Sequence, residues 1–326
     1  MSVDAQERQE AQAGGGFQLP AWFDWRRDII FIGFVVIFLI FAILLGDQGF
    51  MSSQNLLNIA RQSAIIMVIA VGMTFVIANA EIDLSVGSIA GLTSVSTAMA
   101  IAAFGLVPGI LAGLVTGAIV GAVNGALVAY VRIPSFLVTL AMMGVAAGFA
   151  QWITSSAPIP IIDDTFTGLF GSGNIGPIPG LVVWSLLAVA VGAVALNRTR
   201  FGRKVLATGS NRTAAEYSGI NTRAIKFRVM MISAMAASLA GMLYAGRLQS
   251  GRFQWGDGDE LTAIAAVILG GTALAGGRGS IVRTMFGALL MGLINNGLIL
   301  AGLDSSQQQI IRGIIIVLAV ALARGR

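Results

Sequence analysis

Long apolar segments separated by short polar ones dominate the chain from about residue 29 onward. A helix that crosses the hydrocarbon core of a bilayer needs about 20 mainly apolar residues. By that measure the pattern predicts ten transmembrane helices, at residues 29–46, 62–80, 86–104, 107–130, 135–153, 181–196, 227–246, 259–275, 283–303 and 308–323. The sixth is short and the eighth contains glycines, so a count of nine stays open. The predicted fold is an all-α, polytopic helical bundle.

Basic residues are distributed unevenly around these segments. Of the 20 Lys and Arg residues, all but Arg61, Arg247, Arg252 and Arg312 fall on the side of the N-terminus. Because basic residues accumulate on the cytoplasmic side of membrane proteins, both termini are predicted to be cytoplasmic. Polar residues 1–21 are expected to form a mobile cytoplasmic tail, and residues 22–326 the membrane domain. The sequence pI of about 10.4 then reflects topology, and nucleic acid is not an expected partner.

Composition narrows the chemistry that is open to this chain. Hydrophobic residues make up 56% of it and charged residues 11%, and it contains neither Cys nor His. Disulfides, thiol nucleophiles, the usual zinc sites and histidine acid–base catalysis are therefore excluded. The chain also lacks the G-x-x-x-x-G-K-[ST] pattern that holds nucleotide phosphates. We expect no enzymatic activity, no metal and no bound cofactor, so any ATP would be bound by another subunit.

A basic loop at residues 197–226 interrupts the apolar pattern and is predicted to be cytoplasmic. Thr213-Ala214-Ala215-Glu216 fits a capping box, in which the threonine caps the helix and the glutamate bonds back to it. Gly219 stands where a C-terminal glycine ends a helix. The pattern predicts a short helix at residues 214–218, which needs support from neighbours or from a partner. We interpret it as a docking element.

Glycines recur every four residues in the fourth predicted span, at Gly113, Gly117, Gly121 and Gly125. They share one helix face, and such faces usually serve close helix packing. Part of this span, residues 121–127, resembles residues 292–298 of the ninth span. The similarity suits an inverted repeat of spans two to five against spans seven to ten.

Several polar residues fall in or beside apolar segments and are candidates for a gate or a solute pathway. Asn79, Glu81, Asp83 and Ser85 follow the second span, where carboxylates at membrane depth would be costly. Three interpretations are possible. The residues could form a hydrated hairpin at the depth of the lipid headgroups, Asp83 or Ser85 could cap the next helix, or the residues could form a gate. The remaining candidates, Asn124, Asn295 and Asn296, lie within spans and suit either solute contacts or interhelical hydrogen bonds.

Four stretches, which follow one another in the expected order, resemble motifs of the permease subunits of bacterial ABC sugar importers. The resemblance is to the ribose-transporter type. The stretches are Gly72–Phe75, Ile82–Ser88, Asn211–Ile220, and Ala265–Thr272 with Gly276–Ser280. The resemblance extends from about residue 30 to the C-terminus. One departure is Ala80-Glu81, where many members carry a glycine pair.

The resemblance implies a complex in the bacterial inner membrane. In such importers two permease chains, here expected to be identical, form the pathway through the lipid bilayer. Two cytoplasmic ABC ATPase subunits hold ATP and Mg²⁺ and act on short coupling helices of the permeases. The coupling residues would be Asn211, Thr213, Ala214, Ala215, Glu216, Ser218 and Gly219. A periplasmic binding protein would deliver a sugar or a sugar-like polyol to loops 154–180 and 252–260.

Two alternatives remain open from the sequence. An ABC permease for branched-chain amino acids or nucleosides would share the same architecture. A secondary transporter coupled to an ion gradient through Glu81 and Asp83 would need no ATPase. Uptake by the isolated chain along an ion gradient would distinguish the second alternative from both ABC readings.

Overall fold

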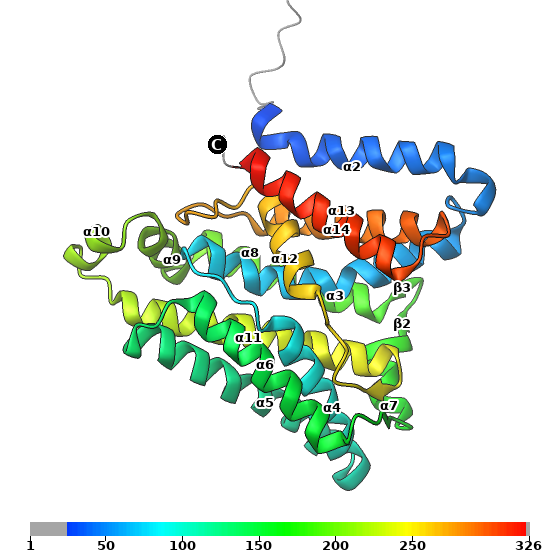
Figure 1. The fold of residues 1–326 in the computed structure, drawn as a ribbon, viewed down its shortest axis with the longest axis horizontal. Coiled ribbons are helices and arrows are strands. Elements are labelled where there is room, and N and C mark those ends of the chain that lie inside the picture. Colours follow the sequence, from blue (N-terminus) through cyan, green and yellow to red (C-terminus); the bar gives the residue numbers. More distant parts are fainter. Residues whose placement is uncertain (1–24, 324–326) are drawn as a thin grey trace, which may run out of the picture.

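The structure, a computed structural model of the full chain, describes residues 25–323 (Figure 1). The tail predicted for residues 1–21 lies outside this range. The long helices are α2 (Trp25–Leu44), α3 (Ser53–Ala78), α4 (Val86–Phe104), α5 (Leu106–Ala126), α6 (Ser135–Thr154), α8 (Gly180–Arg198), α11 (Thr222–Arg247), α12 (Asp259–Leu269), α13 (Ile281–Leu300) and α14 (Ser305–Ala323).

Short elements connect the long helices. The short helices are α7 (Asp164–Thr167), α9 (Arg200–Ser210) and α10 (Arg212–Tyr217), with a 3₁₀ turn η1 (Gly46–Gln48) and π-helical turns η2 (Leu127–Val131) and η3 (Gly168–Ser172). Strands β1 (Ile159–Pro160) and β4 (Ser250–Gly251) pair antiparallel, as do β2 (Asn174–Ile175) and β3 (Ile178–Pro179). These two-residue ladders lie in the loops.

Within the described residues, seven helices are long and apolar enough to cross a membrane. They are α3, α4, α5 with its extension η2, α6, α8, α11 and α13. The chain is therefore an all-α, multi-pass membrane protein, although the predicted count of ten is not confirmed. The eighth predicted span, 259–275, is wrong beyond residue 269, because α12 ends at Leu269. A glycine pair follows, and Gly271 has a φ of +81°, which takes the backbone out of the helix.

The helix α3 begins nine residues before the start of the predicted span at residue 62. Ser52 precedes it in an extended conformation and its hydroxyl accepts a hydrogen bond from the Asn55 N–H (3.2 Å). This cap starts the helix in a polar segment that hydropathy alone excludes. The hydrophobic pattern therefore marks the membrane crossing and the cap marks the true start of the helix.

The helices α3 and α11 lie at the centre of the bundle and pack against each other. Around α11 lie α4 and α5, and around α3 lie α12 and α13 (Figure 1). The helix α4 also contacts α5 and α6, just as α12 contacts α13 and α14. Among the helices of the second to fifth and seventh to tenth predicted spans, the contacts in one set therefore match those in the other. Two copies of one unit would give this pattern.

The glycine face of α5 lies against α11. A Cβ atom added at Gly117 would lie 2.5 Å from the Ser238 Cβ atom, and one added at Gly121 would lie 2.8 Å from that of Ala234. An added Cβ at Gly125 would lie 2.9 Å from Phe227 of α11, whereas at Gly113 the nearest atom, at 2.5 Å, is the Thr97 hydroxyl oxygen of α4. Because real Cβ atoms do not approach so closely, larger residues here would force α5 away from α11 and, at Gly113, from α4.

Candidate coupling and gating site

The helix α10 projects from the end of the bundle at which α3 ends and α11 begins (Figure 1). It starts two residues earlier than predicted, because its cap is Asn211 and not Thr213. The Asn211 backbone is extended and its Oδ1 atom accepts a hydrogen bond from the Ala214 N–H (3.0 Å). Thr213 lies inside the helix and is exposed. The capping-box interpretation is therefore wrong, although the element it predicted exists.

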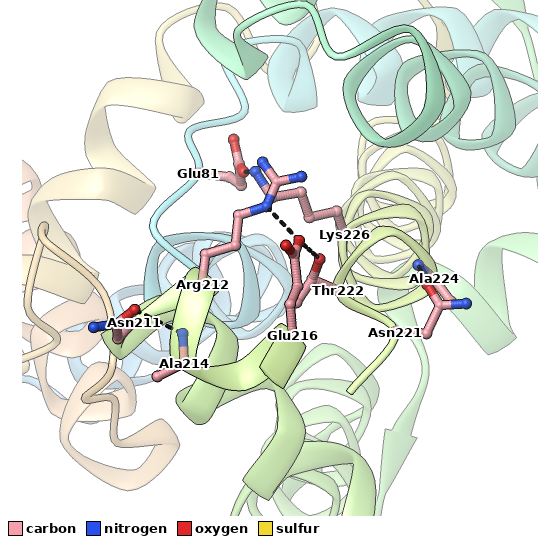
Figure 2. A network of polar contacts seen from close by, with 9 residues as sticks. All are labelled: Glu81, Asn211, Arg212, Ala214, Glu216, Asn221, Thr222, Ala224 and Lys226. Carbon is pink, nitrogen blue, oxygen red and sulfur yellow. Dashed lines mark hydrogen bonds and ion pairs between the residues drawn. The ribbon is translucent and has the colours of Figure 1, made fainter. Parts of the chain in front are cut away.

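Glu216 joins α10 to the start of α11 (Figure 2). Its Oε1 atom accepts hydrogen bonds from the Thr222 hydroxyl (2.6 Å) and the Arg212 Nε–H (3.0 Å). The hydrogen bond from Thr222, and then that from Arg212, lower the pKa of Glu216 below its ordinary value. The carboxylate thus stays charged while it links the two helices. The sequence analysis identified Glu216, but it predicted a bond to the backbone of Thr213 instead of bonds from Thr222 and Arg212.

The end of α10 is fixed by a tight turn. The Ile220 N–H donates to the Ala215 carbonyl and the Gly219 N–H donates to that of Glu216, both at 3.0 Å. Gly219 has a φ of +79°, a left-handed conformation that glycine adopts without the steric cost of a Cβ atom. Six residues of helix thus have an ordered boundary at both ends.

Almost all of α10 is accessible to a partner. Within the predicted coupling set only Ala215 is buried, whereas Asn211, Thr213, Ala214, Glu216, Ser218 and Gly219 are exposed. Tyr217 is the most exposed large hydrophobic side chain in the described residues, at 91%. Sequence reasoning missed it, although an aromatic residue in an otherwise polar run is the kind of side chain that anchors an interface.

An ion pair connects the first turns of α11 to the loop between α3 and α4 (Figure 2). Lys226 follows Thr222 by one helical turn and its ammonium group contacts the Glu81 carboxylate. Both side chains are largely buried, with 15% and 8% exposed. Glu81 is thus neutralised by a partner that the sequence analysis did not name. No local sequence pattern joins these two residues, because they lie on segments that are 145 positions apart.

The loop at residues 79–85 is held in a defined conformation. Ala80 has a φ of +59°, so an alanine adopts the left-handed conformation that a glycine would take more easily. From α6, Ser135 accepts a hydrogen bond from the Ile82 N–H (3.1 Å) and Thr139 accepts one from the Leu84 N–H (3.0 Å). Loop 79–85 is therefore anchored to α6 on one side and to α11 on the other.

Asp83 and Ser85 organise the start of α4 without contact with water. Asp83 is fully buried, and its Oδ1 atom accepts hydrogen bonds from the Ser85 N–H (2.9 Å) and the Ser85 hydroxyl (2.6 Å). Asn124 of α5 donates to the Ser85 hydroxyl (3.0 Å). Asn79, which precedes them in the same loop, is also buried. This geometry excludes the hydrated-hairpin reading, because these groups lie inside the protein.

The seven gate or pathway candidates do not form one cluster. Asn296 exchanges two hydrogen bonds with Asn55 of α3 (2.9 and 3.1 Å). Asn295 accepts a hydrogen bond from Arg312 of α14 (3.3 Å). Both lie in the second half of α13, whose first residues lie near the end of α3 that carries loop 79–85. The sequence grouped them by residue type, but the fold separates them.

These observations define a class: a polytopic membrane protein with an exposed, capped helix at one end, tied to a buried polar loop. Residues 55–320 match a family model described as the permease component of branched-chain amino acid transport systems. The chain belongs to this family of ABC transport permeases.

Known relatives match over nearly their whole length. The chain is 40% identical to the ribose import permease of Bacillus subtilis, over 90% of this chain and 91% of that protein. It is 38% identical to the ribose import permease of Escherichia coli K12, over 94% and 96%. It is 32% identical to the xylose transport permease of Haemophilus influenzae, over 90% and 94%. No solved structure matches the chain.

Proposed function

We propose that this chain is the membrane-spanning subunit of an ABC importer that carries a sugar or a sugar-like polyol into the cell. The observation that carries the proposal is its 40% identity, over 90% of the chain, to a ribose import permease. A pentose is accordingly the first candidate solute. The family description names branched-chain amino acids, but the similar relatives cited above are named for ribose and xylose.

The structure supports α10 as the coupling helix. It is short, ordered at both ends and almost wholly exposed, with Tyr217 as its most prominent side chain. A separate ATPase subunit would hold ATP and Mg²⁺ and would bind this surface. In that arrangement the end with α10 is cytoplasmic, as are both termini. The binding protein would meet the opposite end, where loop 154–180 lies.

A mechanism follows from the contacts of α10. When the ATPases close on ATP, movement of α10 pulls on α11 through the Glu216–Thr222 hydrogen bond. One turn further along α11, the Lys226–Glu81 ion pair transmits the movement to loop 79–85. Asp83 and Ser85 connect this loop to α4, and Asn124 connects it to α5. Two permease copies moving in this way would alternate access to a pathway between them.

The ion-coupled alternative loses support from the same geometry. It rested on Glu81 and Asp83 as ion-binding carboxylates. Glu81 is occupied by Lys226, which leaves one buried carboxylate in loop 79–85. Coupling through a partner ATPase requires no free carboxylate and explains the exposed helix.

The test is uptake in proteoliposomes that contain the permease, its candidate ATPase and its candidate binding protein. Labelled D-ribose, D-xylose and L-leucine are compared, with ATP inside the vesicles or with a proton or sodium gradient alone. We expect uptake of a sugar that requires both ATP and the binding protein. Uptake of L-leucine only would reassign the solute, and gradient-driven uptake without ATP would overturn the proposal.

A further inference from the structure

A polar cavity of about 120 Å³ lies far from α10, among α3, α11, α12, α13 and α14. Arg247, the last residue of α11, is one of its lining residues, whereas Lys226 and α10 lie at or before the first turns of that helix. Tyr244, which also lines the cavity, follows Lys226 by 18 residues, so about 27 Å of α11 separates the two regions at 1.5 Å per residue. The cavity is therefore distinct from the coupling region.

Polar and charged side chains surround this cavity in an otherwise apolar bundle. They include Gln62, Tyr244, Arg247, Asp259, Gln308 and Arg312. Polar groups placed among membrane helices are costly and usually face a pathway or a ligand. Such groups, contributed by four different helices, converge on one space of the size of a single small sugar.

The hydrogen bonds within the lining leave capacity for a ligand. The Tyr244 hydroxyl donates to the Asp259 carboxylate (2.6 Å), and Arg312 donates to Asn295 (3.3 Å). The Arg247 side chain has no hydrogen bond or ion pair to another residue in the described part of the chain. Its five N–H donors and the remaining acceptors of Asp259 are thus available to an occupant.

The mixture of donors and acceptors selects the kind of occupant. A hydroxyl group both donates and accepts, so neighbouring hydroxyls can bond to a guanidinium and a carboxylate together. An anionic group only accepts, so it could bond to the arginines but not to the remaining acceptors of Asp259. The lining also contains Ile66, Met291 and Ile315, which provide apolar contacts for C–H groups. A neutral polyhydroxy compound can bond to the donors and the acceptors and can also contact the apolar side chains.

We propose that this cavity is a binding site for a neutral polyhydroxy solute of pentose or hexose size, within the permease itself. The inference rests on the proposed function and deepens it, because it places a solute-binding site at the end of the bundle opposite α10. Binding there is weak, in the millimolar range, since a transported solute must leave again.

Because the chain contains no cysteine, a single introduced thiol gives a clean probe. Gln308→Cys places it in the cavity, and Ser306→Cys places a matched thiol on the exposed surface less than one turn away. The full permease–ATPase complex is treated in lipid nanodiscs with N-ethylmaleimide, and modification of the permease is followed by intact mass. The probes are D-ribose, D-xylose and myo-inositol at millimolar concentration, with D-gluconate as the anion.

We expect at least one neutral polyol to slow modification at Gln308→Cys by threefold or more, without effect at Ser306→Cys. Adding Asp259→Asn to the Gln308→Cys chain should remove this protection, and Arg247→Gln serves as a second variant if the first misfolds. Gln309→Ala, on the exposed side of α14, should leave protection intact. Stronger protection by D-gluconate, equal protection at both thiols, or none from any neutral polyol would overturn the proposal.

The uptake assay keeps this inference separate from the proposed function. If ATP-driven sugar uptake is intact but no polyol protects the cavity, the site is wrong and the importer stands. If neither uptake nor ATPase coupling is found, the proposed function itself fails.

Discussion

At the scale of single residues, the contact between Glu81 and Lys226 is the link on which the mechanism depends most. It joins two segments that are 145 residues apart in the sequence. A charge left alone in a buried site costs several kcal/mol, because the solvation that it lost is no longer compensated. Both partners are largely buried, so each depends on the other.

Removing one partner should therefore be worse than removing both. We expect Glu81→Gln or Lys226→Met alone to destabilise the protein by about 3 kcal/mol. The double variant should recover part of that loss and give a coupling energy of about 1 kcal/mol or more. Thermal unfolding of the four proteins in nanodiscs measures it. Strictly additive effects would mean that the two groups do not interact.

The left-handed conformation of Ala80 leads to a second prediction. Ala80→Gly removes the clash of a Cβ atom in this region and should leave stability unchanged or raise it by up to about 1 kcal/mol. Ala80→Val should lower stability by more than Ala80→Gly raises it, because β-branched side chains are poorly accommodated at positive φ. Unfolding temperatures of both variants provide the comparison. If valine were tolerated as well as glycine, loop 79–85 would not have the conformation described.

The lowered pKa of Glu216 predicts how α10 responds to pH. A carboxylate whose pKa is lowered by folding stabilises the folded state above its ordinary pKa of 4.5, and the effect is lost as pH falls through the lowered value. Amide exchange of α10, corrected for its intrinsic pH dependence, should therefore show constant protection from pH 8 to about pH 5 and reduced protection below pH 4.5. Protection lost already near pH 6 would contradict the assigned hydrogen bonds.

At the scale of elements, α10 is predicted to be a docking surface rather than a structural one. Tyr217 is 91% exposed, so Tyr217→Ala should leave unfolding unchanged while it weakens ATPase binding by about 30-fold, the loss typical of a central aromatic anchor. Tyr130→Ala is the matched control: this tyrosine of η2 is also exposed, but its ring packs against that of Phe227 in α11. Titration of purified ATPase onto permease nanodiscs gives both affinities. Equal losses for the two variants would remove the special role of α10.

The elements also show how far the sequence could predict this structure. Apolar segments identified the membrane helices because lipid requires continuous hydrophobicity, and this signal is local. The early end of α12 escaped prediction because residues 273–275, which follow the glycine pair and Thr272, are still apolar. Asn211 was identified for its family motif rather than as a cap, because Thr213 offers a similar signal two residues later.

The site could be predicted only in part, for a related reason. Glu81 and Asp83 were identifiable as carboxylates beside apolar segments, and Glu216 as part of a helix-capping pattern in a polar loop. Their partners were not, because Lys226 and Asn124 reach them through helix packing over long sequence distances. The polar cavity among five helices has no local signature at all, and residues such as Arg247 and Arg312 were read only as topological charges.

At the scale of the whole molecule, the bundle has two functional ends. One carries α10 and loop 79–85, joined by Glu216, Thr222 and Lys226 along the start of α11. The other carries the polar cavity and the paired loop strands β1 and β4. The central helices α3 and α11 connect the ends and pack on each other. A transporter driven from one side needs this rigid connection between the end that is pushed and the end that receives the solute.

The most direct test of the account is purification of the chain after co-expression with its candidate ATPase and binding protein. Subunit stoichiometry and ATP hydrolysis are measured together, with and without sugar-loaded binding protein. We predict a complex of two permeases and two ATPases whose hydrolysis rises when the loaded binding protein is added. A permease that purifies alone, binds no ATPase and still transports solute along an ion gradient would contradict the account.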